Sequence, residues 1–374
     1  YGSYAPNNFK VNFSDNGIIN IPYVSMGANY PDVSWQKTTM KNIGLDFYLL
    51  SDRISGSFDF FRNDITRLLG YASTSPLAIY ETRPINGGHY YRRGWELMVD
   101  TKNLVGEFTW DTSLTFSKTN SFWKERLPNY DYQIYQQREN EPMSAYYYYN
   151  VTGIINTDRS NMPESQKTLQ AEAQLPGCPI IEDKNKDGKI DENDVYMKDN
   201  SPAIYVGIGN TFTYKRFEFS FFMYGQFGIQ KYNIAYSAAQ AGPLAVDYPE
   251  NSNKFAYRLW NSQTNPNGSR PGLAIGKMGA LPGNAWVNAD RENASFMRMR
   301  NITLAYNLAG NILGSLQRYV RNIKVYVDAQ NPFILTKFQG FDPEIYTGGG
   351  GASGGSRGEY PQTRTFSLGA NITF

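Results

Sequence analysis

The sequence predicts an all-β protein, an antiparallel transmembrane β-barrel with long extracellular loops. Three observations lead to this prediction. Segments of about ten residues alternate between apolar and polar side chains, which is the period of a strand with two different faces. Aromatic residues make up 15% of the chain, and Tyr and Trp favour the membrane–water boundary. Short and long links between these segments alternate along the chain, as the short periplasmic turns and long extracellular loops of an outer-membrane barrel do.

The last stretch of the chain, TFSLGANITF, shows the alternation most clearly. Its apolar residues share one face of an extended strand, and polar residues and glycine share the other; the apolar set is Phe366, Leu368, Ala370, Ile372 and Phe374. A barrel needs such a strand, because one face meets lipid and the other meets a wet lumen. We therefore interpret this segment as a membrane-spanning strand.

Eight earlier segments repeat the pattern, which gives about nine strands in all. We expect them at residues 41–49, 54–60, 95–100, 107–116, 204–208, 217–223, 296–306 and 323–330. In the seventh strand the apolar positions change face near Arg300, which predicts a β-bulge. Residues 1–37 and 68–88 lack clear alternation and are expected to be long links.

The link lengths indicate the orientation and completeness of the barrel. The short links lie near Ser51, Asn103, Lys215 and Gly310, and we assign them to the periplasm. An odd number of strands cannot form a barrel with both ends in the periplasm. We therefore expect this chain to form the later part of a larger barrel, and we expect residues 41–62 not to pair with the terminal strand.

Composition excludes several classes of protein. The formal net charge of +2 provides no basic field that would attract nucleic acid. The sequence contains no run of about 18 apolar residues, so we predict no transmembrane helix. Cys178 and His89 are the only cysteine and histidine, so neither a disulfide nor a Cys/His zinc site can form. No nucleophile elbow accompanies His89, which we interpret as an ordinary residue at a loop edge. We predict no catalytic residues and no enzyme activity.

Four segments resemble segments of a known family, and they follow one another in the same order as in that family. They include KNIGLDFYLLSDRISGSFDFF at 41–61, DKNKDGKIDEND at 183–194 with the hairpin after it, residues 295–344, and YPQTRTFSLGANITF at 360–374. Together they resemble the C-terminal barrel region of SusC-like TonB-dependent outer-membrane transporters, a group that includes RagA-like proteins. One departure is Asn331-Pro332, where the family has Asn-Leu; proline removes a ladder donor and is tolerated near a strand end.

The resemblance implies a fold, a location and partners. Residues 1–374 would form the last nine of about 22 strands around a plugged lumen, in the outer membrane of a Gram-negative bacterium. Such importers move oligosaccharides or peptides and work with a SusD-like surface lipoprotein as a lid. TonB would supply energy through the N-terminal plug, which together with the first strands has no counterpart here.

Residues 183–194, within an expected extracellular loop at 155–200, have the spacing of an EF-hand calcium loop. Oxygen donors fall at positions one, three, five, nine and twelve, glycine falls at position six, and position seven offers a backbone carbonyl. The predicted ligands of a structural Ca²⁺ are Asp183, Asn185, Asp187, Lys189, Asp191 and Asp194. The alternative is an Asp/Asn-rich surface turn.

Aromatic residues are weaker candidates for substrate binding. Tyr146, Tyr147, Tyr148 and Tyr149 form a run, and Trp123 is a further candidate. Aromatic faces can stack on sugar rings or peptide side chains, but packing at the base of an extracellular loop is the favoured interpretation of the run. A secreted, calcium-stabilised, β-rich glycan-binding protein therefore remains the alternative to a transporter.

Overall fold

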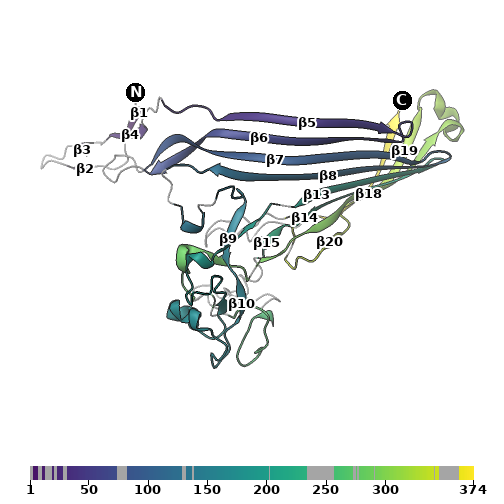
Figure 1. The fold of residues 1–374 in the computed structure, drawn as a ribbon. Coiled ribbons are helices and arrows are strands. Elements are labelled where there is room, and N and C mark those ends of the chain that lie inside the picture. The colour runs from purple at the N-terminus through teal and green to yellow at the C-terminus, as the bar shows by residue number, and fades with distance from the viewer. Residues whose placement is uncertain are drawn as a thin grey trace. The chain divides into compact units, whose positions relative to one another are not determined.

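A computed structural model gives the fold (Figure 1). It describes residues 3–6, 11–12, 19–20, 23–27, 32–73, 82–128, 132–136, 139–201, 203–233, 257–272, 275, 278–289, 291–340, 342–344 and 362–374. None of the helices in these ranges is long and apolar enough to cross a membrane.

One large antiparallel sheet contains all nine strands expected from the sequence. Its path runs β21-β19-β18-β14-β13-β8-β7-β6-β5, and β20 (Ile334–Thr336) pairs with β18 beside this path. The strands are β5 (Lys37–Leu49), β6 (Ile54–Ser73), β7 (Thr82–Leu104), β8 (Phe108–Glu125), β13 (Ile204–Tyr214), β14 (Phe217–Phe227), β18 (Phe296–Ala309), β19 (Asn322–Gln330) and β21 (Thr365–Thr373). The two ends of the path, β5 and β21, do not pair with each other, as predicted.

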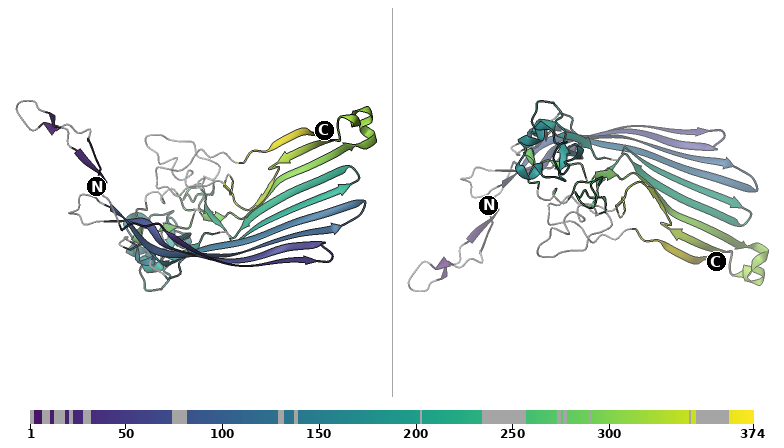
Figure 2. Two further views of the ribbon diagram at one scale, coloured as in Figure 1. Left: turned by 90° about the horizontal axis from the view of Figure 1, so that it is seen from above. Right: turned by 90° about the horizontal axis from the view of Figure 1, so that it is seen from below.

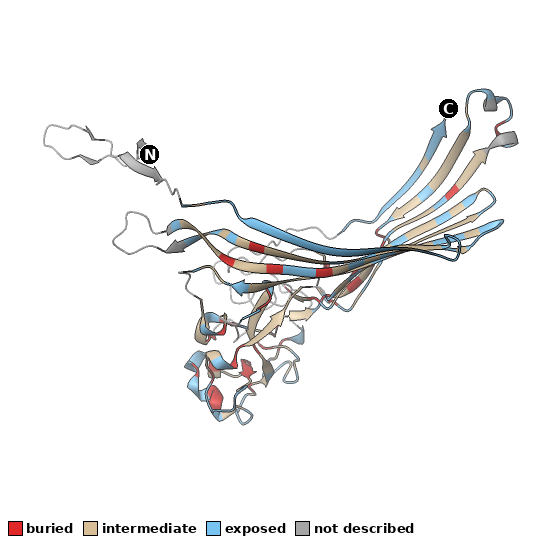
Figure 3. Cartoon of the chain, turned by 45° about the horizontal axis from the view of Figure 1, so that its top comes forward, coloured by how far each residue is buried: buried red, intermediate tan, exposed pale blue. Residues whose placement is uncertain are grey.

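The pairing register puts apolar residues of neighbouring strands on one face. Phe212 lies opposite both Trp110 and Phe219, and Phe219 lies opposite Leu304. The rings of Trp110 and Phe212 are stacked with centroids 5.6 Å apart. We call this side the apolar face and the opposite side the polar face. Large apolar side chains on the apolar face are exposed, as Leu368 shows at 78% (Figure 3). Such a wide exposed apolar surface indicates contact with lipid.

The polar face carries charged residues of several strands. Lys324 of β19 binds Glu218 of β14 with Nζ–Oε1 at 2.8 Å, and the hydroxyl of Thr303 donates to Asp328 at 2.6 Å. Pairing across strands lets these groups line a wetted wall without leaving an isolated charge.

The bulge predicted near Arg300 is confirmed. Asn301 pairs with Phe222, but the next residue of β14, Met223, pairs with Met299, so Arg300 is the extra residue. On the other side β19 stops at Gln330 and β20 resumes the pairing at Ile334. Pro332 lies between these two strands and therefore removes no ladder hydrogen bond.

Several expected boundaries are wrong. Much of 68–88 is strand, because β6 continues to Ser73 and β7 begins at Thr82. His89 lies within β7 and not at a loop edge. The turn expected at Asn103 falls at 105–107. Beyond the membrane both faces of a strand meet water, so backbone pairing continues where alternation has ended.

The chain divides into two compact units. The first comprises 1–39, 63–91 and 123–131, and the second comprises 40–62, 92–122 and 132–374. In the first unit β1 (Ser3–Pro6) pairs with β4 (Tyr23–Gly27), and β2 (Val11–Asn12) pairs with β3 (Ile19–Asn20), so the expected link at 1–37 contains short strands. His89 Nε2 lies 3.3 Å from Asp64 Oδ1 in the same unit.

The second unit contains a loop module, residues 132–136, 139–201 and 278–289, with its own hydrophobic core. Two links build it, one between β8 and β13 and one between β14 and β18. Its buried residues include Tyr149, Ile155 and Val195 from the first link and Met278 and Leu281 from the second. The expected loop at 155–200 is therefore one part of a larger folded body.

Short elements form this module (Figures 1 and 2). They are η1 (Ile134–Gln136), β9 (Ala145–Tyr149), β10 (Val151–Ile154), η2 (Glu164–Thr168), η3 (Ala171–Gln174), β11 (Pro179–Ile181), η4 (Glu192–Asp194), β12 (Tyr196–Asp199), η8 (Pro282–Asn284) and β16 (Trp286–Val287). Strand β9 is central, because it pairs with β12 on one side and β16 on the other. Outside the module, β15 (Gln230–Tyr232) pairs with β17 (Arg291–Asn293), and η9 (Gly310–Arg318) joins β18 to β19.

Neighbouring residues on β21 test the assignment of the two faces. We expect Leu368→Lys in the full-length protein to weaken folding into lipid vesicles by roughly 2 kcal/mol or more, because a cation on the lipid side must be desolvated. Ser367→Lys, one residue away on the polar face, should have little effect. Heat-modifiable gel mobility measures the folded fraction. Equal losses from both variants would contradict the assignment.

Candidate functional site

The predicted calcium loop, 183–194, has the backbone that an EF-hand-like turn requires. Gly188, at position six, has φ +84°, and its N–H donates to Asp183 Oδ2 at 2.8 Å. Asp187 N–H donates to Asn185 Oδ1 at 3.1 Å, and Lys189 N–H donates to Asp187 Oδ1 at 3.0 Å. The side chains of positions one, three and five thus hold the turn through backbone amides.

Asp194, at position twelve, is fully buried and fixes the end of the loop. Its carboxylate accepts hydrogen bonds from Lys184 N–H and Asp191 N–H, both at 2.9 Å. Asp191 caps η4 by accepting from Asn193 N–H at 2.8 Å. Within the described part of the chain, no three His, Cys, Asp or Glu side chains converge enough to hold a metal ion. Among the described residues, however, the buried Asp183 Oδ1 has no hydrogen-bond partner.

Two residues of the tyrosine run belong to the core of the loop module. Tyr149 is fully buried, and its hydroxyl lies 3.0 Å from the carbonyl oxygens of Asp191 and Pro282. Burial, with a smaller contribution from the Asp194 carboxylate, raises the pKa of Tyr149. Tyr147 packs on Tyr135 with ring centroids 5.0 Å apart and donates to Glu141. Tyr147 and Tyr149 therefore pack within the loop module, which was the favoured interpretation of the tyrosine run.

The other two tyrosines lie in a row of stacked rings on the opposite face of β9. The Tyr146 and Tyr148 centroids are 5.1 Å apart, and Tyr148 and Tyr196 follow at 5.8 Å. Cations cover both ends of the row, with Arg291 3.6 Å from the Tyr146 ring and Lys184 4.7 Å from the Tyr196 ring. The ring faces of Tyr146 and Tyr148 are therefore already occupied.

Trp123 belongs to the first compact unit, whereas the tyrosine run belongs to the second. It lies edge-on to Tyr90 with centroids 6.1 Å apart, and the Arg126 guanidinium lies 5.5 Å from its ring.

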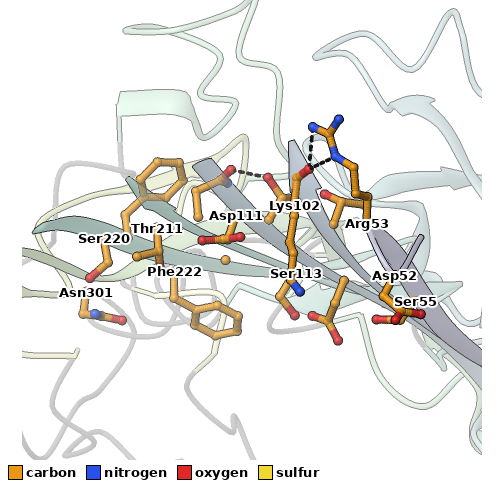
Figure 4. Close-up of a pocket in the computed structure, with 16 residues that line it drawn as sticks. Asp52, Arg53, Ser55, Lys102, Asp111, Ser113, Thr211, Ser220, Phe222 and Asn301 are labelled. Atoms are coloured by element: carbon orange, nitrogen blue, oxygen red, sulfur yellow. Dashed lines mark hydrogen bonds between the residues drawn. The ribbon is translucent and has the colours of Figure 1, made fainter. Parts of the chain in front are cut away.

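A pocket that sequence reasoning missed lies along the sheet of the second unit and is lined mainly by its polar face (Figure 4). Its volume is about 390 Å³. Polar lining residues come from six strands of the sheet, and they include Ser55, Asp100, Asp111, Thr211, Ser220 and Asn301, with Phe222 as an aromatic member. Only the pairing order of the strands brings them together, so no local motif marks them.

Arg298 lies in a buried ion network and not at an exposed rim. Its guanidinium binds both carboxylate oxygens of Asp342, at 2.7 and 2.8 Å, and also contacts Glu344, which accepts from Tyr224. Asp342 further accepts from Gln362 N–H at 3.3 Å. The network fastens both ends of the glycine-rich link between β20 and β21 to the wall strand β18.

Comparison with known proteins adds sequence and fold evidence. No family model matches the sequence. The chain is 28% identical to the TonB-dependent receptor SusC of Bacteroides thetaiotaomicron and 25% identical to TonB-dependent receptor P3 of Formosa agariphila, over 92% of this chain in both cases. The chain is homologous to SusC-like TonB-dependent receptors. It spans about a third of their length, 32% of SusC and 34% of P3.

Solved structures agree with this SusC-like fold. The RagAB peptide importer in its closed-closed state matches all of this chain with a TM-score of 0.72 at 18% identity, and the chain covers 38% of that protein. A second RagAB structure gives a TM-score of 0.70. The predicted barrel fold and outer-membrane location are confirmed. The relatives are receptors and transporters and not enzymes, in agreement with the prediction.

The Arg298 network offers a stability test in the full-length SusC-like protein. Arg298→Met leaves the buried Asp342 carboxylate and the partly buried Glu344 carboxylate without their cation and should cost about 3 kcal/mol of unfolding free energy, measured by denaturant titration in detergent. Arg300→Met is the matched control, because Arg300 is exposed and its guanidinium donates to the Asn331 amide oxygen, at 3.2 Å, and not to a carboxylate. A loss no larger than that of the control would show that the network does not hold the link.

Proposed function

We propose that the chain is the later part of an active importer of large nutrients, oligosaccharides or peptides, across the outer membrane. The observation that carries the proposal is the two-faced sheet, with an exposed apolar side for lipid and a polar side with paired charges for a wet lumen. Homology to TonB-dependent receptors over 92% of the chain supports it. Transport through such a wall needs no covalent step on the cargo.

The partners follow from the same proposal. The relatives' dependence on TonB suggests that TonB supplies the energy, acting through a plug outside the present chain. The open edges β5 and β21 suggest pairing with further strands of the same protein. The RagAB importer has two named components, which supports a SusD-like lipoprotein as a surface lid.

The alternative, a secreted glycan-binding protein, fits the sheet poorly. Phe366, Leu368 and Phe374 are between 75% and 79% exposed and lie on one side of β21. A soluble protein rarely leaves a continuous apolar surface of this extent uncovered.

Cell fractionation distinguishes the two proposals. The full-length protein should remain in the membrane fraction after salt washing, dissolve only in detergent, and migrate differently in gels before and after boiling. Deletion of its gene should abolish growth on the one polymer that it imports. Full solubility without detergent would contradict the transporter.

We also propose that residues 183–194 bind a structural Ca²⁺. The donors that fit are Asp183, whose buried Oδ1 lacks a partner, together with Asn185 and Asp187, whose side chains already face the turn. Lys189 would contribute its carbonyl oxygen, and Asp191 and Asp194 would complete the set. The bound ion would neutralise the carboxylates and order the loop.

Equilibrium dialysis with ⁴⁵Ca²⁺ tests this site. Asp183→Asn should weaken binding at least tenfold, because it removes a charged hard-oxygen ligand. Asp158→Asn is the control, since Asp158 is exposed, lies outside the loop and accepts a hydrogen bond from Ser160 N–H. Chelation should also speed amide exchange at 183–195. An unoccupied loop with unchanged exchange would contradict the proposal.

Substrate binding by the predicted aromatic residues remains a weaker proposal. Tyr147 and Tyr149 would contribute only through the core that they stabilise. Tyr146 and Tyr148 could offer ring edges and hydroxyl groups, and Trp123 could act in the first unit.

A further inference from the structure

The link between β18 and β19 differs from the other short links of the sheet. At 50–53, 105–107 and 215–216 the chain reverses in a tight turn, whereas the link at 310–321 contains η9. All four links lie at the same end of the sheet (Figure 2), the end that we assign to the periplasm. A tight turn would be enough to join β18 to β19, so the longer link has a further role.

A row of aromatic residues marks the membrane boundary at this end of the sheet. On the apolar face the pairing register places Phe108, Tyr214, Phe217 and Tyr306 side by side on four neighbouring strands. The ring centroids of Phe217 and Tyr306 are 4.7 Å apart. Aromatic rings gather at the level of the lipid headgroups in outer-membrane barrels. The row therefore shows at which level of each strand the hydrocarbon ends.

Beyond this row the lipid-facing surface extends farther beside η9 than at the neighbouring turn. At the turn between β13 and β14 a charge pair follows at once, because Lys215 Nζ lies 3.5 Å from Glu107 Oε1 and 5.2 Å from the Tyr214 ring centroid. Strands β18, β19 and β21 instead carry one more apolar row, formed by Leu308, Ile323 and Ile372.

Two arginines lie at the outer end of this apolar surface. Arg321 precedes Ile323 by two residues, which is the period of one strand face, and its N–H donates to the Thr373 carbonyl at 2.7 Å. Arg318 ends η9 and is exposed. Among the described residues neither guanidinium has an ion-pair or hydrogen-bond partner. Lys324 of β19, by contrast, already pairs with Glu218 on the polar face.

The rest of the link is apolar where it is exposed and contains no acidic residue. Ile312 is 50% exposed and Tyr319 is 69% exposed, whereas Leu313 is buried and holds η9 in place. No Asp or Glu occurs anywhere in 306–327. Exposed apolar side chains combined with cations are typical of a segment that lies in the membrane interface, where the apolar groups reach the acyl boundary and the cations reach the phosphates.

We propose that residues 310–321 bind an anionic phospholipid of the periplasmic leaflet. Arg318 and Arg321 contact its phosphate, and Ile312 and Tyr319 lie at the boundary of its acyl chains. The continuity of the link with the lipid-facing sheet makes a lipid the occupant, and the two cations without partners select a lipid with a net negative charge. The site lies on the outside of the barrel wall and depends on no cargo.

Native mass spectrometry of the full-length protein in detergent tests the site. The probes are phosphatidylglycerol and phosphatidylethanolamine with identical acyl chains. We expect the wild type to prefer phosphatidylglycerol. Arg318→Gln and Arg321→Gln should each weaken its binding about fivefold, and the double variant about 25-fold, because each cation attracts the anionic lipid. Phosphatidylethanolamine binding should stay unchanged.

Two further double variants serve as controls. Arg318→Lys with Arg321→Lys keeps both charges and should retain the preference for phosphatidylglycerol. Lys124→Gln with Arg159→Gln removes two exposed cations outside the link and should bind both lipids like the wild type. Heat-modifiable gel mobility measures the folded fraction of each variant, so that only folded protein is compared.

Three results would overturn the lipid site. They are equal affinity of the wild type for both probes, an unchanged preference in the folded Arg318→Gln, Arg321→Gln variant, and preferential binding of lipid A, which would move the link to the outer leaflet. None of these measurements involves cargo. Loss of the lipid site therefore leaves the proposed importer intact, and absence of transport leaves the lipid site intact.

Discussion

Backbone hydrogen bonding is the constraint on which the rest of this structure depends. In hydrocarbon each N–H and C=O of a spanning strand must find a partner in a neighbouring strand, because no water is present to replace it. The irregular region obeys the same constraint. At the bulge Asn331 N–H donates to Arg300 C=O at 2.9 Å, and Met299 N–H donates to the Phe333 carbonyl at 3.1 Å, so pairing persists where the register shifts. Pro332 lies at a position where strand pairing needs no backbone N–H donor.

The sequence predicted the parts of the fold in which a strand separates lipid from water. There the period of two is visible, and it located all nine strands, both faces and the slip at Arg300. The alternation of apolar and polar residues ends where both faces of a strand meet water. The continuation of β6 to Ser73 could therefore not be predicted from alternation. The tyrosine run shows a second limit: alternation separates Tyr147 and Tyr149 from Tyr146 and Tyr148, but only the fold shows which pair meets the core.

The functional residues were harder to predict than the strands for a physical reason. The proposed calcium loop is a local motif, because one short segment would supply its oxygens. The pocket around Phe222 takes one to three residues each from strands as far apart in sequence as those of Ser55 and Asn301.

Two links of the chain share the single core of the loop module. This constrains when the module can fold during synthesis and which segments can be replaced separately. Residues 139–201 emerge first, but the core around Tyr149 and Val195 stays incomplete until Met278 and Leu281 have been made. Strands β13 and β14 are synthesised between the two links. The core of the module can therefore be completed only after this hairpin has been synthesised. Replacement of one link alone would leave half of a core, so we expect the two links to be exchangeable only together.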